Sequence, residues 1–361
     1  MKIIHCSDIH LGASMTTHLT LEQSQKRKQE LLNTFLNLVD YAKKEEISSI
    51  IIAGDLLDTD NVNPQTKNVL LDKIINNPTI NFYYLCGNHD ENSLILQNEE
   101  LPQNLKTFKN TWTTFSVPNT NIKITGAILG NNNYNLYQSL NLNPDDFNII
   151  VLHGQDIRGN DFQTPDTVNL DLLKNKNIDY LALGHLHSYR QGKLDSRATY
   201  AYSGCLEGRG FDECGEKGFI LLDIHNNTFN TTFTPFAKRT LHEIKVDITN
   251  LYSLQQIQAE IQKNIQNIKK DSLLRIVFVG NYNEHTQKYL HLATLDLQEK
   301  YYFVQVKDQT KPQLDLTQYE NDISLAGEFI KTVRESDLSK EEQDKIIILG
   351  LQALNGEEIE L

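Results

Sequence analysis

The chain has 361 residues, of which 39% are hydrophobic and 22% charged, and its formal net charge is −13 at pH 7. This composition is typical of a globular protein, and the length exceeds one ordinary core, so two or three domains are expected. No apolar run approaches the roughly 18 residues that a membrane span needs. The acidic balance weighs against broad non-specific binding of nucleic acid, which basic surfaces dominate.

The N-terminus and the cysteines indicate a compartment. The first residues enter a predicted strand directly and lack the architecture of a signal peptide. The 4 cysteines are scattered along the chain, which argues against a disulfide framework. These features predict a protein of the reducing cytoplasm that has no membrane partner.

The first two thirds of the chain alternate apolar strands with amphipathic helices. Apolar residues recur at helical spacing over residues 22–45 and 63–76, and Pro64 stands in the first turn of the second helix. The predicted strands cover residues 2–6, 47–53, 81–86, 123–129, 148–153, 180–183, 198–203 and 218–224. This order predicts an α/β fold in which two mixed β-sheets pack together and helices flank them.

A different pattern follows residue 235. Strands at residues 241–249, 273–280 and 301–307 alternate with helices at residues 251–270 and 285–299. Two more helices are expected at residues 323–334 and 339–354. We therefore predict a main domain over residues 1–235, a small α/β domain over residues 236–312 and a helical C-terminal region over residues 313–361.

Metal-binding residue types gather in five segments of the main domain, each directly after a predicted strand. The segments are Asp8-Ile9-His10, Gly54-Asp55, Gly87-Asn88-His89-Asp90, His153-Gly154 and Gly184-His185-Leu186-His187. A pair such as Asp8 and His10 can reach one metal, because residues i and i+2 of an extended segment point the same way. His185 and His187 share this spacing but could also serve different metals.

The donor types indicate the kind of site. The carboxylate of Asp55 has two oxygens and can bridge two cations about 3.5–4 Å apart, as a two-metal site requires. Carboxylate, amide and imidazole donors without thiolate favour manganese, iron, zinc or magnesium over a structural zinc cage. His89 remains once two metals are coordinated, and it could protonate a leaving oxygen. Asp58 and Asp90 could orient ligand imidazoles by hydrogen bonds.

Each segment alone also has a structural explanation. A single Asp-x-His or Gly-Asp pair is most often a turn, and Gly-Asn-His-Asp is a good turn sequence. Five such segments in this order, each after a strand, favour a metal-dependent hydrolase of phosphate esters.

The series from Asp8-Ile9-His10 to Gly184-His185-Leu186-His187 resembles the calcineurin-like metallophosphoesterase superfamily. The segments at residues 5–12, 53–58 and 202–207 look like its SbcD branch, nuclease subunits that act in DNA repair and recombination. The resemblance implies a four-layer fold with one metal held by Asp8, His10, Asp55 and His187. The other metal would be held by Asp55, Asn88, His153 and His185, and His89 would be the catalytic histidine.

The resemblance also implies cofactors and partners. Two divalent metals, most often manganese in this branch, would occupy the site. The module at residues 236–312 would be a capping domain, the tail would contact an SbcC-like coiled-coil ATPase, and helices of the main domain would form a homodimer.

Three hypotheses follow. The first is a manganese-dependent DNA nuclease, with exonuclease and some single-strand endonuclease activity, that works beside an ATPase. The second keeps the chemistry but takes small nucleotides or phosphoproteins as substrates, which suits the acidic net charge. The third is a non-catalytic scaffold, which the complete ligand set disfavours.

Overall fold

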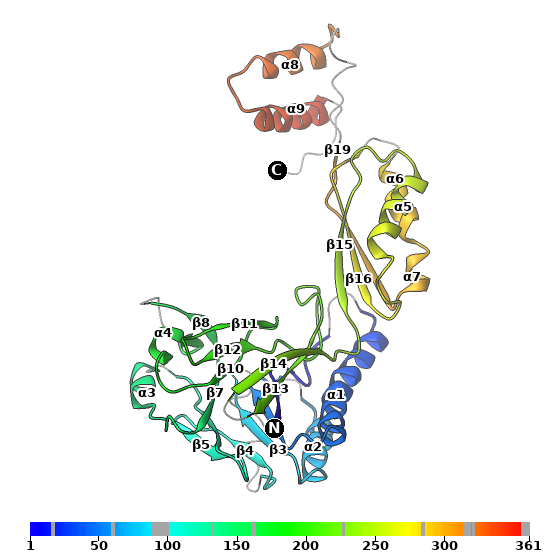
Figure 1. Ribbon diagram of the computed structural model, residues 1–361. Coiled ribbons are helices and arrows are strands. Elements are labelled where there is room, and N and C mark those ends of the chain that lie inside the picture. Colours follow the sequence, from blue (N-terminus) through cyan, green and yellow to red (C-terminus); the bar gives the residue numbers. More distant parts are fainter. Residues whose placement is uncertain are drawn as a thin grey trace. The chain divides into compact units, whose positions relative to one another are not determined.

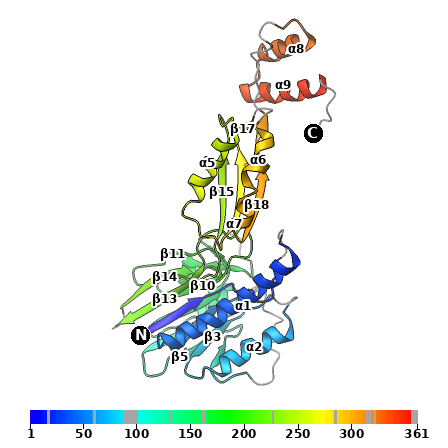
Figure 2. The ribbon, with the colours of Figure 1, turned by 90° about the vertical axis from the view of Figure 1, so that its right-hand side faces the viewer.

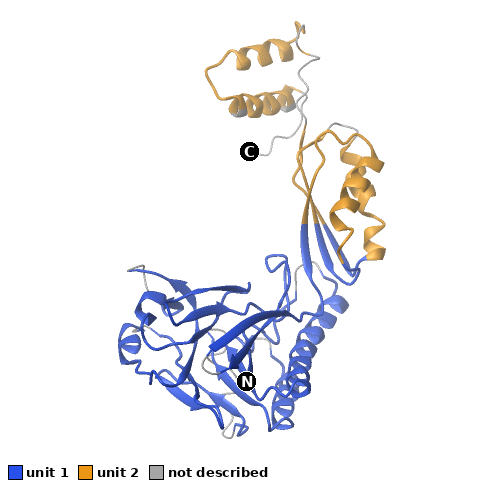
Figure 3. Cartoon of the chain, viewed as in Figure 1, with its two compact units in different colours: residues 1–243, 269–275, 301–305 blue, residues 244–268, 276–300, 306–361 orange. Residues whose placement is uncertain are grey.

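The computed structural model describes residues 1–15, 19–58, 62–87, 101–130, 133–159, 164–225, 228–282, 286–312, 319 and 322–354. The chain forms two compact units, coloured separately in Figure 3. The first unit holds residues 1–243, 269–275 and 301–305, and the second holds residues 244–268, 276–300 and 306–361. The division at residues 235 and 312 stays a prediction.

The first sheet of the first unit has the strand order β14-β13-β1-β2-β3-β4 (Figure 1). Its parallel part is formed by β1 (Lys2–Cys6), β2 (Ser49–Ala53), β3 (Asn81–Leu85) and β4 (Leu105–Thr107). Two antiparallel strands extend it beyond β1, namely β13 (Gly218–His225) and β14 (Thr228–Pro235).

The second sheet has the order β11-β12-β10-β7-β6-β5. Its four central strands are parallel: β6 (Ile122–Gly126), β7 (Phe147–His153), β10 (Tyr180–Gly184) and β12 (Thr199–Tyr202). The edge strands β5 (Thr113–Ser116) and β11 (Arg190–Lys193) pair antiparallel with their neighbours. A small parallel pair, β8 (Gln155–Ile157) and β9 (Thr167–Asn169), follows β7 along the chain.

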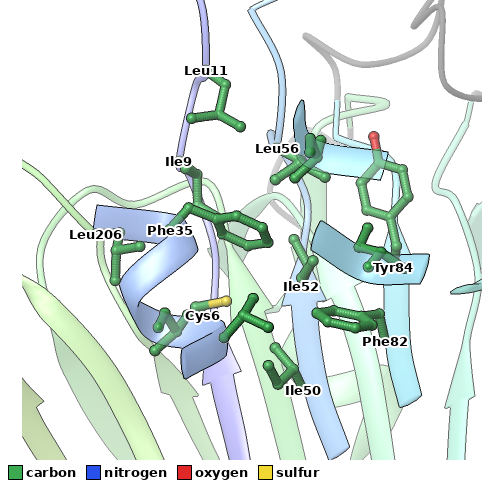
Figure 4. Close-up of a cluster of buried hydrophobic side chains, with 14 of the residues drawn as sticks. Cys6, Ile9, Leu11, Phe35, Ile50, Ile52, Leu56, Phe82, Tyr84 and Leu206 are labelled. Carbon is green, nitrogen blue, oxygen red and sulfur yellow. The ribbon is translucent and has the colours of Figure 1, made fainter. Parts of the chain in front are cut away.

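Alternation along the strands builds three apolar layers. In β2, Ile51 and Ala53 face a core shared with the second sheet, whereas Ile50 and Ile52 face the helices. Those helices are α1 (Leu21–Lys44) and α2 (Pro64–Ile75), which lie along the outer face of the first sheet (Figures 1 and 2). Figure 4 shows Phe35 of α1 packed among Cys6, Ile50 and Ile52.

The second sheet is covered in the same way on its own outer face. Tyr137 of α3 (Asn133–Ser139) and Leu173 of α4 (Leu170–Leu173) pack with β7 and β10 in a third cluster. Two packed mixed sheets with helices on both outer faces confirm the predicted α/β fold class.

The small module and the tail contain further elements. A sheet of order β15-β16-β18 is formed by β15 (Leu241–Asp247), β16 (Leu273–Val279) and β18 (Phe303–Asp308). Within the second unit, α5 (Leu254–Ile265) buries Ile257, Ile261 and Ile265 along one face. The single helix predicted at residues 285–299 is two helices, α6 (Gln287–Thr294) and α7 (Leu297–Lys300). The turn between them leaves Leu290 and Leu297 both buried.

The described part of the tail is a helical hairpin. It consists of α8 (Leu325–Arg334) and α9 (Lys340–Leu354), which bury Ile330, Val333 and Ile347 between them. A two-residue parallel pair, β17 (Asn281–Tyr282) and β19 (Lys311–Pro312), precedes it. Of the helices in the described residues, none is long and apolar enough to cross a membrane.

A buried network of charges joins α1 to two later segments of the first unit. Arg27 donates to Glu30 at 2.7 Å, to Glu207 at 3.1 Å and to the carbonyl oxygen of Gly208 at 2.8 Å. Glu207 also accepts from the Thr34 hydroxyl at 2.9 Å, and Arg239 binds Glu30 at 2.6 Å. Arg27 and Glu207 are each 1% exposed, so neither charge is compensated by water.

Arg27→Met should therefore destabilise the first unit strongly. The substitution leaves Glu207 buried without its arginine, and breaking a buried ion pair by removing one partner costs about 3–5 kcal/mol. Urea denaturation followed by circular dichroism measures the loss. Lys28→Met, at the exposed neighbouring position, is the control and should change the midpoint little. An Arg27→Met midpoint equal to wild type would contradict the assigned role of this network.

Candidate metal centre

The predicted metal-binding residues follow strands that end at one edge of each sheet. Asp8 and His10 follow β1, and Asp55 follows β2, which runs parallel to β1. His153 is the last residue of β7, and its register partner Gly184 ends β10 just before His185. Because neighbouring parallel strands end at the same edge, the fold itself gathers these side chains.

Backbone hydrogen bonds tie the loops of the first sheet together. The amide of Asp8 donates to the carbonyl oxygen of Gly54 at 3.1 Å, and the amide of His10 donates to that of Asp55 at 2.9 Å. The amide of His185 crosses from the other sheet and donates to the two carboxylate oxygens of Asp8 at 2.9 and 3.1 Å. Asp8 is thus held between both sheets before any cation is considered.

The site residues adopt unusual backbone conformations. The φ angles of Asp8, His10, Asp55 and His185 are 51°, 49°, 50° and 104°. Such left-handed conformations cost of order 1–3 kcal/mol for residues other than glycine, and they concentrate at functional sites. The hydrogen bonds between the loops offset this strain and hold the side chains where an ordinary turn would not place them.

Close contact between the sheets also requires small residues. Gly54 has a φ of +93°, and a Cβ there would lie 2.0 Å from Nδ1 of His153. A Cβ on Gly184 would lie 1.8 Å from the carbonyl oxygen of Ala53. These two glycines allow the His153 ring to reach the first sheet.

The side chains form two groups among the described residues. Asp8, His10 and His187 offer ligand atoms that all lie within 4.8 Å of one another, and so do Asp8, Asp55 and His153. Oδ2 of Asp55 lies 3.6 Å from Nε2 of His10 and 3.3 Å from Nε2 of His153. One oxygen therefore faces the histidines predicted for different metals, which is the position of a bridging ligand.

The geometry differs from the predicted ligand sets in the placement of Asp8. Asp8 was expected in one set only, yet it belongs to both groups. The His185 ring packs edge-on against His153, with ring centroids 5.4 Å apart, and it lies outside both groups. Its ligand role, like that of the other site residues, stays a prediction.

Of the remaining predicted residues, the structure describes only Asp58. Asp58 is half-buried, and its amide donates to the carbonyl oxygen of Leu11 at 2.9 Å. Asn88, His89 and Asp90 lie outside the described residues, so their roles stay predictions.

Burial and mutual contact shift the pKa values of the side chains in the cluster. Desolvation raises the pKa of Asp8, although His153, His187 and the Ser7 hydroxyl act in the opposite direction. Burial alone would lower the pKa of His153, but hydrogen bonding to Asp55 and the charge of Asp8 outweigh it and raise this pKa to about 9. In the protein alone, His153 therefore carries a proton at neutral pH.

The donor chemistry fits divalent cations. His153 donates from Nδ1 to the carbonyl oxygen of Ala53 at 2.9 Å, which directs Nε2 toward Asp55. Burial raises the pKa of the Cys6 and Cys205 thiols, which therefore stay neutral and add no thiolate. The available set consists of carboxylates and imidazoles, as expected for manganese, iron, zinc or magnesium.

Two contributors were not identified from the sequence. The Ser7 hydroxyl donates to Asp8 and pairs with the Ser203 hydroxyl at 2.8 Å. Glu213 lies 2.7 Å from Nδ1 of His187. Burial acts to raise the pKa of Glu213, but the hydrogen bonds from His187 and Arg209 outweigh burial and hold this pKa well below its usual range. An acidic residue in an irregular loop has no pattern that marks it, and only the fold brings it to the site.

Comparisons with known proteins define the class. The model of the calcineurin-like phosphoesterase family matches residues 1–189. The chain belongs to this family and is a hydrolase of phosphoester bonds. The family uses a dinuclear metal site, and the two groups found here are candidates for its ligands.

Three relatives are similar over most of the chain. The uncharacterized metallophosphoesterase YhaO of Bacillus subtilis is 25% identical over 79% of this chain and 73% of its own length. The DNA double-strand break repair protein Mre11 of Sulfolobus acidocaldarius is 23% identical over 96% of this chain and 94% of its own. A subunit of the nuclease SbcCD of Staphylococcus epidermidis is 25% identical over 96% of this chain and 97% of its own.

Asp55→Asn should weaken metal binding most among the ligand substitutions. A neutral amide bridges two cations poorly, so we expect a loss of at least about tenfold in manganese affinity, or about 1.4 kcal/mol. Calorimetric titration and metal analysis of the purified protein measure it. Asp223→Asn, a surface carboxylate paired with the N-terminus, is the control. Unchanged metal content in Asp55→Asn would refute the bridging assignment.

Metal binding should also release protons. The pKa of His153 is about 9, so its ring is protonated at neutral pH. A cation that binds Nε2 must therefore displace a proton. The apparent affinity for manganese should therefore rise with pH from 6 to 8, by up to about tenfold per unit for one displaced proton. Titration in buffers of different ionisation enthalpy counts the protons. A constant affinity over this range would contradict the protonated state.

Proposed function

We propose that the protein is a two-metal DNA nuclease, most active with manganese, that hydrolyses phosphodiester bonds as the nuclease subunit of an SbcCD-like DNA repair complex. The observation that carries the metal site is Oδ2 of Asp55, which faces both His10 and His153 across distances of 3.6 and 3.3 Å. A carboxylate placed between two sets of imidazoles suits two cations that act on one phosphate.

The proposed ligands divide as the resemblance implies. Asp8, His10, Asp55 and His187 would hold one cation, and Asp55, Asn88, His153 and His185 the other. The pair would supply positive charge to the scissile phosphate and lower the pKa of a water molecule. His89 is the proposed proton donor to the leaving oxygen.

The substrate is proposed from the relatives. The two that are named as a repair protein and as a nuclease subunit match 96% of this chain, far beyond residues 1–189 of the family match. This extent supports a role on DNA for the whole chain. It also supports the residues at 236–312 as a capping domain that shapes access of DNA to the metals.

Charge and exposed apolar surface support the proposed partners. A net charge of −13 disfavours DNA binding by the chain alone, so a partner should supply basic surface. We propose an SbcC-like coiled-coil ATPase, docked on the helical tail, where Leu325 and Leu338 are 73% and 43% exposed. A homodimer through α2 is proposed as well, and Ile75 at the end of that helix is 54% exposed.

The acidic charge also supports a second candidate. A phosphodiesterase or phosphatase for small nucleotides or phosphoproteins needs no extended basic surface. Cleavage of cyclic nucleotides in preference to DNA would favour it.

Purified protein with manganese should degrade linear and hairpin DNA, alone or with the coiled-coil ATPase. His89→Ala should lower the rate at least about 100-fold, because general acid catalysis typically contributes 10²–10⁴. His225→Ala, at an exposed histidine paired with Asp223, is the control and should keep the wild-type rate. Equal degradation by wild type and His89→Ala, or no degradation even with the ATPase, would refute the nuclease proposal.

A further inference from the structure

The two nitrogens of the His187 ring face different surroundings. Nε2 lies 3.4 Å from Nε2 of His10 and 3.9 Å from a carboxylate oxygen of Asp8. Nδ1 lies 2.7 Å from Oε1 of Glu213. The ring thus presents one nitrogen to the candidate ligands and the other to a carboxylate outside both groups.

Glu213 is held rigidly in a buried position. The residue is 3% exposed, and its Oε2 accepts from the amide of Arg209 at 2.7 Å. Its Oε1 accepts from the Arg209 guanidinium at 2.7 and 3.2 Å. A carboxylate with this many donors has little freedom to turn away from His187.

The backbone of His187 is fixed by the same loop. Its carbonyl oxygen accepts from Nζ of Lys217 at 2.7 Å and from the amide of Cys205 at 3.3 Å. Lys217 is 3% exposed, so this contact is also sheltered from water. The segment 205–217 therefore holds both the main chain and the ring of one proposed ligand.

The position of a single proton depends on this arrangement. Nδ1 of His187 can donate to Glu213 or accept from the Arg209 guanidinium, which lies 3.0 Å away, but it cannot do both. A carboxylate only accepts, so at 2.7 Å it requires a hydrogen on Nδ1. In the neutral ring, Nε2 then keeps a lone pair on the side of His10 and Asp8, where a cation would bind.

We propose that Glu213 is a positioning residue that fixes the His187 tautomer with the proton on Nδ1, and that Arg209 holds Glu213 in place. Without the carboxylate, Arg209 donates to Nδ1 instead. The ring proton then moves to Nε2 and blocks that nitrogen as a ligand. This inference rests on the metal-binding role proposed for His187, but it does not depend on the substrate.

Because Arg209 is a second hydrogen-bond donor near Nδ1 of His187, three variants should affect the tautomer differently. Glu213→Gln loses the charge that holds the proton but leaves Arg209 as a competing donor. Glu213→Asp keeps a carboxylate on a shorter arm, so it retains the tautomer and part of the affinity. Glu213→Gln combined with Arg209→Met removes the competing donor, and the glutamine carbonyl can then accept from Nδ1.

The test measures manganese affinity by calorimetry and the His187 tautomer by NMR of ¹⁵N-histidine-labelled, metal-free protein. Glu213→Gln should bind manganese about 10–100-fold more weakly, the usual loss when a partner of a ligand histidine is removed. Its His187 proton should move to Nε2. Glu213→Asp should lose less, and the double variant should regain affinity over Glu213→Gln.

Glu207→Gln is the matched control, because Glu207 is an equally buried carboxylate of the same segment that binds Arg27. It should alter stability while the affinity of the folded protein and the His187 tautomer stay as in wild type. The proposal is overturned if Glu213→Gln keeps the Nδ1 proton, or if Glu207→Gln weakens manganese binding equally. Neither readout uses DNA, so a failure of the nuclease proposal alone would leave both results intact, whereas a wild type without manganese binding would overturn the metal role itself.

Discussion

The site depends on the contact between the ends of the two sheets. The bond from Nδ1 of His153 to the carbonyl oxygen of Ala53, 2.9 Å long, joins the last residue of β7 to the last residue of β2. It forms only because Gly54 and Gly184 leave room for the ring and the backbone. Together with the bond from the His185 amide to Asp8, it brings the imidazoles of one sheet to the carboxylates of the other.

Hydrogen bonds from the surrounding backbone offset the conformational strain and the buried charge at the site. Four proposed ligands adopt positive φ angles, and buried carboxylates face buried imidazoles. The amide of His185 on Asp8 and the loop bonds between the segments after β1 and β2 fix these conformations. These bonds fix the backbone of the proposed ligands within the protein itself, so the fold positions their side chains.

Much of this could be predicted from the sequence. Apolar runs followed at once by Asp, His or Gly predicted the strands β1, β2, β3, β7 and β10. They also indicated that the polar residues after these strands would lie close together, because parallel strands end at a common edge. The edge strand β14 was missed, since its polar sequence, Thr228–Pro235, lacks the apolar alternation of a half-buried strand. Its strand conformation comes from pairing with β13 along its whole length.

The finer chemistry of the site depends on distances that a sequence does not encode. The shared position of Asp8 arises from the crossing of two sheets, and the role inferred for Glu213 arises from a loop that folds back 26 residues after His187. Neither follows from residue type or spacing. Sequence patterns identify donors after strands, whereas packing decides which donors meet.

The long separation between the meeting residues affects how the protein is made. Nε2 of His10 and Nε2 of His187 are 3.4 Å apart in space but 177 residues apart in the chain. During synthesis, Asp8 and His10 leave the ribosome first, at about 5–20 residues per second, and their partners follow many seconds later. A nascent chain therefore cannot bring His10 and His187 together until the strands of the second sheet have emerged.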